Sequence, residues 1–256
     1  MSIDIFGAGV VPPVPGFAKT ALVQELPGDE GHDHEAEVII GTNQPDDIVT
    51  GGGPQQIWGL NGADTIHAGG GPDVIDGGNG ADSLFAGGGP DTVDGGNGND
   101  YLSGGGGPDD LNGGNGDDVL IGGMAPDILT GGLGADVFVY RAASDARAHG
   151  EGDSHAPGED DGHHDDGGGG GPGASGQETI TDFEPGKDQI DFSAFGTVAG
   201  LSDDPGAYLI WAVQQGEDTM LYVDTDGAVE GDHPAELGIL LLGVEASSLT
   251  VDDFIL

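Results

Sequence analysis

The chain contains no cysteine and very few basic side chains. The absence of cysteine excludes disulfide bonds and thiolate metal sites. Against 47 acidic residues there are 4 basic ones, which gives a formal net charge of −43. Binding to nucleic acid or to an anionic membrane through the protein's own field requires clustered Lys and Arg. We therefore expect no nucleic-acid partner, and the charge favours cations instead.

Long apolar runs and aromatic residues are also scarce. No stretch approaches the roughly 18 apolar residues of a membrane-spanning helix, so no transmembrane segment is expected. Residues 1–7 lack the basic and apolar regions of a cleaved secretion signal. Aromatic residues make up 5% of the chain and glycine accounts for 55 residues. Such a composition usually indicates disorder, because little apolar surface is available to offset the ordering entropy.

A strict nine-residue repeat argues against disorder. Eleven nine-residue words run without a gap over residues 41–139, and the clearest, residues 77–85 and 113–121, read Gly-Gly-x-Gly-x-Asp-x-U-x, where U is apolar. The eighth position is apolar in every word, so these side chains are expected to point inward as a thin column. One such side chain per word cannot offset a backbone ordering cost of ~1–2 kcal/mol per residue. Something else must hold the turns.

A second, longer period underlies the first. The fifth position is proline in every even word, and the third position is asparagine in the odd words as far as Asn115. The true unit is therefore a pair of words, or 18 residues, with two strands and two turns per coil. This pattern predicts an all-β fold, a right-handed parallel β-roll with 18 residues per coil.

The sixth position supplies the candidate metal ligands. Turns 18 residues apart are expected to stack, so each gap between them holds two aspartates and the carbonyl groups of a glycine-rich turn. Such hard oxygens are the ligands that Ca²⁺ prefers. The five aspartate pairs of the asparagine-bearing column and the three of the proline-bearing column predict about eight calcium sites. The candidate ligands are Asp46, Asp64, Asp73, Asp82, Asp91, Asp100, Asp109, Asp118, Asp127 and Asp136.

Departures from the consensus predict local weaknesses. Gln55 replaces the aspartate of the second word, so its gap with Asp73 is expected to bind calcium weakly or not at all. Ala125 replaces the fourth glycine of the tenth word and is expected to strain the turn at Asp127. The first word lacks two of its glycines, as an end cap does. Without calcium the aspartate columns repel each other, so calcium is expected to fold the repeats.

The repeat consensus resembles the RTX (repeats-in-toxin) calcium-binding repeat. Residues 131–140, residues 180–193 and the ending 249–256 resemble the C-terminal domain of serralysin-type secreted proteins. This resemblance implies that the domain continues the β-roll and carries an uncleaved C-terminal signal for a type I secretion machinery. It also makes Asp182 and Asp188 candidate calcium ligands where the roll ends, with an ordinary turn as the alternative.

The chain is predicted to have four segments. Residues 1–40 form an N-terminal lead-in in which 38–40 is the first strand, and residues 41–139 form the RTX β-roll. Residues 148–176 form a disordered acidic insert rich in glycine and histidine. Residues 177–256 form the serralysin-like β-rich secretion domain, with strand-like runs at 208–213 and 219–223. The insert either binds a transition metal or is a solvated linker, and its histidines are His149, His155, His163 and His164.

No catalytic motif accompanies these features. The string from His34 to Val38 lacks the second histidine of a zinc-protease helix, and no Gly-x-Ser-x-Gly elbow is present. We predict a non-enzymatic, extracellular calcium-binding protein, secreted by a type I system without a cleaved N-terminal signal and folded by external calcium. The alternatives are an accessory module of a secreted enzyme system and a host or cell-surface interaction protein that acts by adhesion or on membranes. No residue specifies a ligand for the folded roll.

Overall fold

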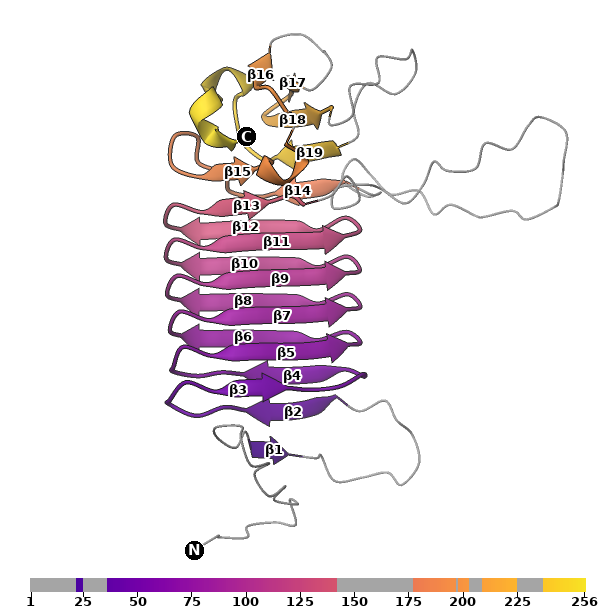
Figure 1. The fold of residues 1–256 in the computed structure, drawn as a ribbon, viewed down its shortest axis with the longest axis vertical. Coiled ribbons are helices and arrows are strands. Elements are labelled where there is room, and N and C mark those ends of the chain that lie inside the picture. Colours follow the sequence, from indigo (N-terminus) through magenta and orange to yellow (C-terminus); the bar gives the residue numbers. More distant parts are fainter. Residues whose placement is uncertain (1–21, 25–35, 142–176, 197, 203–208, 225–236) are drawn as a thin grey trace, which may run out of the picture.

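The computed structural model describes residues 22–24, 36–141, 177–196, 198–202, 209–224 and 237–256. Within these ranges the chain forms two β-sheets, and its helical segments are three short 3-10 turns. Figure 1 shows the repeat strands as successive layers along the long axis, with the C-terminal strands at the end opposite the N-terminus.

The first sheet has 12 strands in the order β1-β2-β4-β6-β8-β10-β12-β14-β19-β18-β17-β16. Its strands are β1 Leu22–Gln24, β2 Glu37–Ile40, β4 Gln55–Trp58, β6 Val74–Asn79, β8 Thr92–Asn97, β10 Asp110–Asn115, β12 Ile128–Leu133, β14 Glu178–Ile180, β16 Leu201–Ser202, β17 Ile210–Gln215, β18 Asp218–Val223 and β19 Leu237–Leu241. The repeat strands of this sheet begin in the even words.

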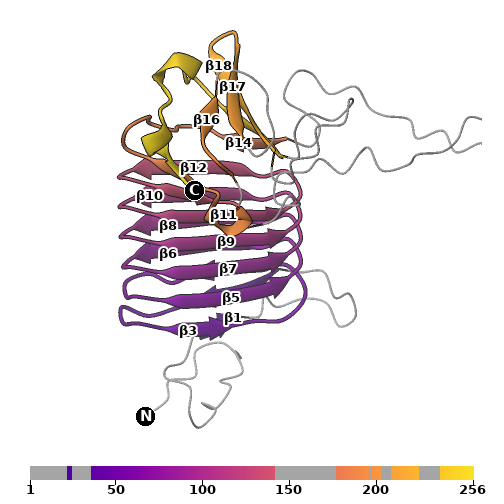
Figure 2. The same cartoon turned by 45° about the horizontal axis from the view of Figure 1, so that its top comes forward.

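The second sheet has eight strands in the order β20-β15-β13-β11-β9-β7-β5-β3. Its strands are β3 Asp47–Val49, β5 Thr65–Gly70, β7 Ser83–Gly88, β9 Tyr101–Gly106, β11 Val119–Met124, β13 Val137–Val139, β15 Gln189–Asp191 and β20 Phe254–Ile255. The 3-10 turns are η2 Ser193–Phe195, η3 Ala246–Ser248 and η4 Val251–Asp253. Because odd words supply this sheet, the chain crosses from one sheet to the other with every word (Figure 2).

The register of the sheets follows the 18-residue period. Repeat strands pair in parallel, and Leu111 lies between Val93 and Leu129 in the first sheet. In the second sheet Leu102 pairs with Leu120 in the same way. The predicted all-β parallel β-roll with 18 residues per coil is therefore confirmed, since turn residues 18 apart are hydrogen-bonded to each other.

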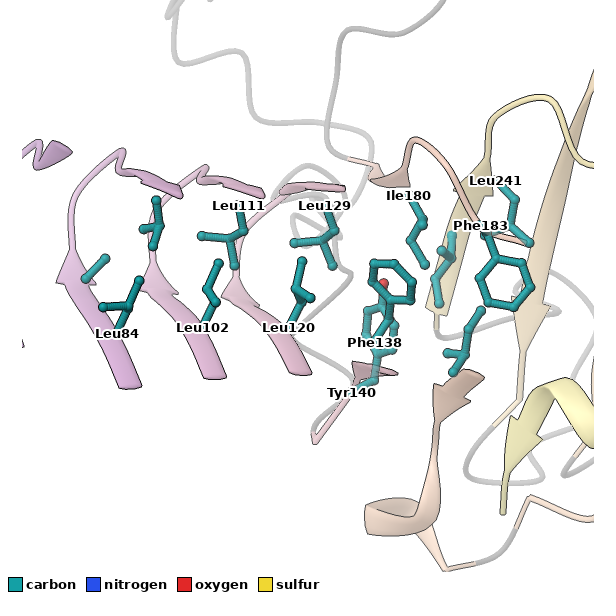
Figure 3. Packing of buried hydrophobic residues seen from close by; sticks show 14 of the residues in the cluster. Leu84, Leu102, Leu111, Leu120, Leu129, Phe138, Tyr140, Ile180, Phe183 and Leu241 are labelled. Carbon is teal, nitrogen blue, oxygen red and sulfur yellow. The ribbon is translucent and has the colours of Figure 1, made fainter. Parts of the chain in front are cut away.

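The core is the thin column that the eighth position predicts. Its two rows, one from each sheet, face each other across the roll (Figure 3). All eleven eighth-position side chains are buried, namely Ile48, Ile57, Ile66, Ile75, Leu84, Val93, Leu102, Leu111, Leu120, Leu129 and Phe138. Toward the C-terminus the column widens into aromatic packing, with Tyr140 stacked on Phe192 at a ring-centroid distance of 5.7 Å.

A ladder of asparagine side chains runs along one row of turns. The side-chain amide of Asn79 donates to Oδ1 of Asn61 at 3.1 Å, Asn97 donates to Asn79 at 3.1 Å, and Asn115 donates to Asn97 at 2.9 Å. An amide both donates and accepts, so each asparagine satisfies the next without adding charge. This explains why the third position of the odd words is asparagine.

The N-terminal end of the roll has one predicted strand and one that was not predicted. The strand expected at 38–40 is confirmed within β2. β1 pairs antiparallel with β2 and extends the first sheet by one strand. β1 falls in the lead-in, where no periodicity points to a strand.

At the other end, the C-terminal strands continue both sheets. β14 pairs in parallel with β12, and β15 pairs in parallel with β13. The predicted strand-like runs correspond to β17 and β18, which pair antiparallel. The 148–176 insert and its histidines lie outside the described residues. Over the part of the chain that the structure describes, no helix is both long and apolar enough to cross a membrane.

Candidate metal sites in the turns

The sixth-position aspartates lie at the start of the strands, and all ten predicted ligands are buried. Their exposed fractions range from 0% at Asp118 to 4% at Asp46. A buried carboxylate needs hydrogen bonds or a counter-charge, because burial removes its hydration. The question is therefore what each carboxylate contacts.

In all of these aspartates except Asp46, one carboxylate oxygen joins neighbouring coils. Oδ1 of Asp82 accepts a hydrogen bond from the backbone N–H of Asp64 at 2.7 Å, and the same contact recurs at 2.7–2.9 Å along both columns. The structure thus brings the sequence-predicted pairs together across 18 residues. Each of these nine side chains holds the turn one coil earlier in the chain.

The second carboxylate oxygen has a different environment. Among the described residues, eight Oδ2 atoms are buried and have no hydrogen-bond partner, those of Asp64, Asp73, Asp82, Asp91, Asp100, Asp109, Asp118 and Asp136. An unsatisfied buried oxygen costs about 1–3 kcal/mol, and more when it is charged. Such a regular set of buried, unsatisfied oxygens is chemically suited to a cation.

Backbone oxygens converge on the same places. A Cβ placed on Gly59 would lie 2.6 Å from Oδ2 of Asp64 and 2.6 Å from the carbonyl oxygen of Gly77. Only glycine leaves this space open, and the two oxygens around it belong to successive coils. Over the described residues no group of three or more His, Cys, Asp or Glu side chains is placed to hold a metal. Except in the gap of Gln55 with Asp73, two carboxylates and backbone carbonyls come together, a donor set that fits Ca²⁺.

Burial also changes the acidity of these groups. It raises the pKa of Asp64, Asp82 and Asp91 to about 6, and that of Asp109 and Asp118 to about 7. Desolvation is the main cause, neighbouring carboxylates add to it, and the backbone N–H donors oppose it. Without a cation the columns therefore hold protons at pH values where free aspartate has lost them.

The first turn of the asparagine-bearing column is capped by its own word. The N–H and hydroxyl of Thr42 donate to Oδ2 of Asp46 at 2.6 and 2.9 Å. This oxygen therefore already has partners, unlike its counterparts deeper in the roll. Thr42 stands where the consensus has glycine, which agrees with the predicted end cap.

The second word keeps a buried oxygen but loses its charge. Gln55 is 3% exposed, and its backbone N–H donates to Oδ1 of Asp73 at 2.7 Å, as the backbone N–H of an aspartate does in the other words. Its side-chain Oε1 is buried without a hydrogen-bond partner. The gap below Asp73 thus has a neutral amide where the other gaps have a carboxylate.

The strain expected in the tenth word is visible in the backbone. Ala125 has φ +87°, in the left-handed region that favours glycine. Leu60, at the second position of the third word, has φ +79° and is a second such residue. Its substitution for glycine is evident in the sequence, although it did not enter the prediction.

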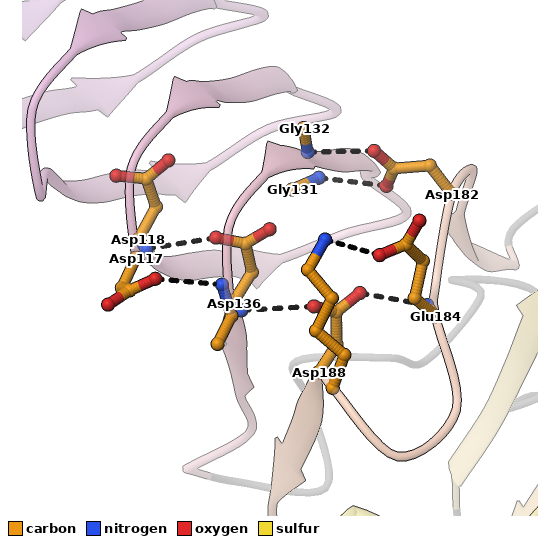
Figure 4. Close-up of polar contacts among 10 residues, drawn as sticks. Asp117, Asp118, Gly131, Gly132, Asp136, Asp182, Glu184 and Asp188 are labelled. Carbon is orange, nitrogen blue, oxygen red and sulfur yellow. Dashed lines mark hydrogen bonds and ion pairs between the residues drawn. The ribbon is translucent and has the colours of Figure 1, made fainter.

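The two candidates beyond the repeats have different surroundings (Figure 4). Oδ1 of Asp188 accepts from the N–H of Asp136 at 3.1 Å, so Asp188 continues the asparagine-bearing column. The carboxylate of Asp182 accepts from the N–H groups of Gly131 and Gly132 at 2.9 and 2.7 Å. Asp182 thus holds the loop against the last repeat, and Asp188 lies at a ligand position.

Sequence reasoning missed Glu178, which continues the proline-bearing column. This side chain is 0% exposed, and its Oε2 accepts from the N–H of Asp127 at 3.1 Å. The signal was the spacing Glu178-Thr179-Ile180, which repeats the Asp-x-U pattern with glutamate in place of aspartate.

Comparison with known families identifies the repeat segment. The model of the RTX calcium-binding nonapeptide repeat matches six overlapping stretches, 40–75, 58–93, 76–111, 94–125, 103–138 and 112–145. Residues 40–145 are RTX calcium-binding nonapeptide repeats. The glycine-lined gaps between the stacked aspartates lie within these repeats. No curated protein matches the chain.

Several solved structures are similar to this chain. The R2 subunit of the mannuronan C5-epimerase from Azotobacter vinelandii is 28% identical with a TM-score of 0.46, covering 67% of this chain and 88% of its own. The R3 subunit of that epimerase is 21% identical with a TM-score of 0.34, covering 89% and 86%. The extracellular lipase LipA from Serratia marcescens is 18% identical with a TM-score of 0.36, covering 86% and 39%. With TM-scores this low, no functional conclusion is drawn from them.

The pKa values predict opposite pH responses with and without calcium. The folded-state values of about 6 and about 7 lie above the ordinary value of 3.8, so the calcium-free folded RTX repeats bind more protons than the unfolded chain. This contribution to stability is complete below 3.8 and is lost as the pH rises through 6 to 7. Calcium-depleted protein should therefore gain β-structure in far-UV circular dichroism on acidification. With calcium present, acidification should raise the calcium concentration needed for folding. A calcium-free β-signal that strengthens as the pH rises through this window would contradict the prediction.

Restoring the missing carboxylate should add a site to the RTX repeats. Gln55→Asp is expected to bind one more calcium ion per chain than the parent, because the backbone N–H of Gln55 already donates to Asp73 and the substitution puts a carboxylate where the buried amide oxygen has no partner. Isothermal titration calorimetry measures the stoichiometry. Gln56→Asp is the matched control, because it adds the same charge on the neighbouring, less buried residue of β4. An equal gain in both variants, or none in Gln55→Asp, would argue against the site.

Proposed function

We propose that this chain is a non-enzymatic, extracellular calcium-binding protein whose RTX repeats fold when they bind calcium. The observation that carries the proposal is the set of eight buried Oδ2 atoms without hydrogen-bond partners, each beside a glycine-rich turn. Such atoms make the ion-free roll costly to form. Calcium supplies the positive charge and the Lewis-acid contacts that these oxygens lack.

About eight sites follow from the aspartate pairs of the two columns. In this proposal Asp46, Asp64, Asp73, Asp82, Asp91, Asp100, Asp109, Asp118, Asp127 and Asp136 are the side-chain ligands, and glycine carbonyl groups complete each site. The sites are not equivalent. The gap between Asp46 and Asp64 is expected to be the weakest of the asparagine-bearing column, because Thr42 already donates two hydrogen bonds to Asp46.

The side chains have a structural role in this proposal. Oδ1 accepts a hydrogen bond from a backbone N–H of the preceding coil, as in Asp100. Oδ2 of the same carboxylate has no hydrogen-bond partner and is proposed to bind the ion. The sequence has no Gly-x-Ser-x-Gly elbow, and the string that begins at His34 lacks the second histidine of a zinc-protease helix. The repeat segment is thus proposed to be a calcium-dependent scaffold.

The proposal is tested by removing and restoring calcium. Protein treated with EDTA should show little β-structure by far-UV circular dichroism, and calcium in the ~0.1–1 mM range typical of extracellular modules should restore it. Magnesium at the same concentration is the control, because it demands a smaller octahedral site and dehydrates reluctantly. A β-spectrum that is unchanged by EDTA and by calcium would refute calcium-driven folding.

We further propose that the chain leaves the cell through a type I secretion machinery. The supporting observation is the resemblance of the C-terminal residues to serralysin-type proteins, including the acidic pair Asp252 and Asp253 before an apolar ending. Deleting residues 251–256 should abolish export from a host with a type I system and leave the cellular amount unchanged. Deleting the equally long stretch 148–153 is the control and should not affect export. Undiminished export after the first deletion would rule out the signal.

A further inference from the structure

We infer that the asparagine-bearing turns are deamidation sites, which the folded roll protects and the unfolded chain exposes. The sequence supplies the chemistry, because five of its seven asparagines directly precede a glycine. These five are Asn61, Asn79, Asn97, Asn112 and Asn115. Protection by calcium rests on the proposed calcium-driven folding, whereas the reactivity of the Asn-Gly pairs does not.

An Asn-Gly pair loses its side-chain amide by an intramolecular reaction. The backbone nitrogen of the glycine gives up its proton to solvent and attacks Cγ of the asparagine. A C–N bond forms, the bond from Cγ to Nδ2 breaks, and Nδ2 takes up a proton and leaves as ammonia. The cyclic imide then adds one water molecule and opens to aspartate or isoaspartate. Glycine favours the attack because no Cβ obstructs its nitrogen and its backbone rotates freely.

In the folded roll the attacking nitrogens are already engaged. The N–H of Gly80 donates to the carbonyl oxygen of Asn97 in the next coil at 2.7 Å. The N–H groups of Gly62, Gly98 and Gly116 donate to the next coil in the same way at 2.7–2.8 Å. Such a nitrogen is not free to lose its proton and turn toward the side chain until the two coils separate.

The side-chain amides are held as well. Asn79 donates to Oδ1 of Asn61 and accepts from Asn97, both at 3.1 Å. The strands β6, β8 and β10 each end on a ladder asparagine, and Asn112 lies within β10. Ring closure requires the side chain and the following peptide plane to rotate toward each other. The extended backbone and the ladder hydrogen bonds oppose both rotations.

Either product would disturb the stack. Aspartate in place of Asn79 lacks the amide donor that reaches Asn61, and it sets a carboxylate against an acceptor oxygen. Isoaspartate lengthens the backbone by one carbon atom before Gly80. The coils leave no room there, because a Cβ on Gly80 would overlap the carbonyl oxygen of Gly62. A chain that stays unfolded therefore gradually loses its ability to form the roll.

Two asparagines of the same turns serve as internal controls. Asn43 precedes Gln44 and Asn99 precedes Asp100, so neither pair contains glycine. The side chain of the following residue crowds the attacking nitrogen and restricts its backbone. Both asparagines should therefore react much more slowly than the Asn-Gly pairs in the unfolded chain.

The test follows each asparagine of the full chain by peptide-map mass spectrometry during incubation at mildly alkaline pH. Parallel samples contain saturating calcium, EDTA or guanidinium chloride, and far-UV circular dichroism records the fold of the first two. The five Asn-Gly pairs should convert to aspartate and isoaspartate in denaturant. In calcium they should convert at least ~10-fold more slowly, because only transiently opened coils react. Asn43 and Asn99 should change little in any sample.

The EDTA sample separates this inference from the proposed function. Conversion there at the rate seen in denaturant supports both. If the EDTA sample keeps its β-spectrum and its asparagines while the denatured sample reacts, calcium-driven folding is refuted and the deamidation sites stand. Equal conversion in calcium and in denaturant, or intact Asn-Gly pairs in denaturant, would overturn the inference.

A product variant measures the damage to the stack. Asn79→Asp should raise the calcium midpoint of the circular dichroism transition, because it replaces the donor to Asn61 with a charge. Ala81→Asp is the matched control, since it adds the same charge in the same turn, at the word position where Asp117 stands naturally. Its midpoint should shift less. Equal midpoints in the two variants would overturn the damage assigned to deamidation.

Discussion

The roll depends on a carboxylate that is buried beside carbonyl oxygens and has no positive charge next to it. One oxygen of each aspartate ties two coils together through a backbone N–H, so the stack needs the residue. The other oxygen, as in Asp82 and Asp100, is buried without a donor, so the same residue lowers the stability of the stack. With one apolar side chain per turn facing inward, the core is too small to outweigh this penalty. In the proposed function, this penalty is what makes folding conditional on a cation.

At the C-terminal end, hydrophobic packing replaces this electrostatic condition. The regular column of leucine and isoleucine gives way to buried aromatic rings, where Tyr140 packs on Phe192 and Phe138 packs on Phe183. In register with Glu178 the next strand presents Ile239, an apolar side chain at a ligand position. The same two sheets thus pass from layers joined through carboxylates to layers joined by aromatic burial. Under the proposed function, such a roll would need ions only where its core is thin.

The sequence allowed the repeat segment to be predicted almost completely, because each feature is local and periodic. The 18-residue register, the buried column and the aspartate pairs all follow from the spacing, and they were found as expected. Beyond the repeats this logic fails for physical reasons. Asp136 meets Asp188 across 52 residues. Glu178 and Asp188 are ten residues apart instead of nine, so the nine-residue spacing of the repeats is lost. β1 pairs antiparallel with β2, and no pattern in residues 22–24 indicates this pairing.

The alternation between asparagine-bearing and proline-bearing turns restricts how such a molecule changes in length. The asparagine ladder and the two aspartate columns each connect words of the same parity. Loss of a single nine-residue word would bring Asn97 next to a glycine and exchange the sheets of every later strand. Loss of a complete coil would leave every contact type intact and remove one gap from each column. Growth or shrinkage by whole coils therefore changes ion capacity in fixed steps, while the specialised ends at Thr42 and Glu178 stay the same.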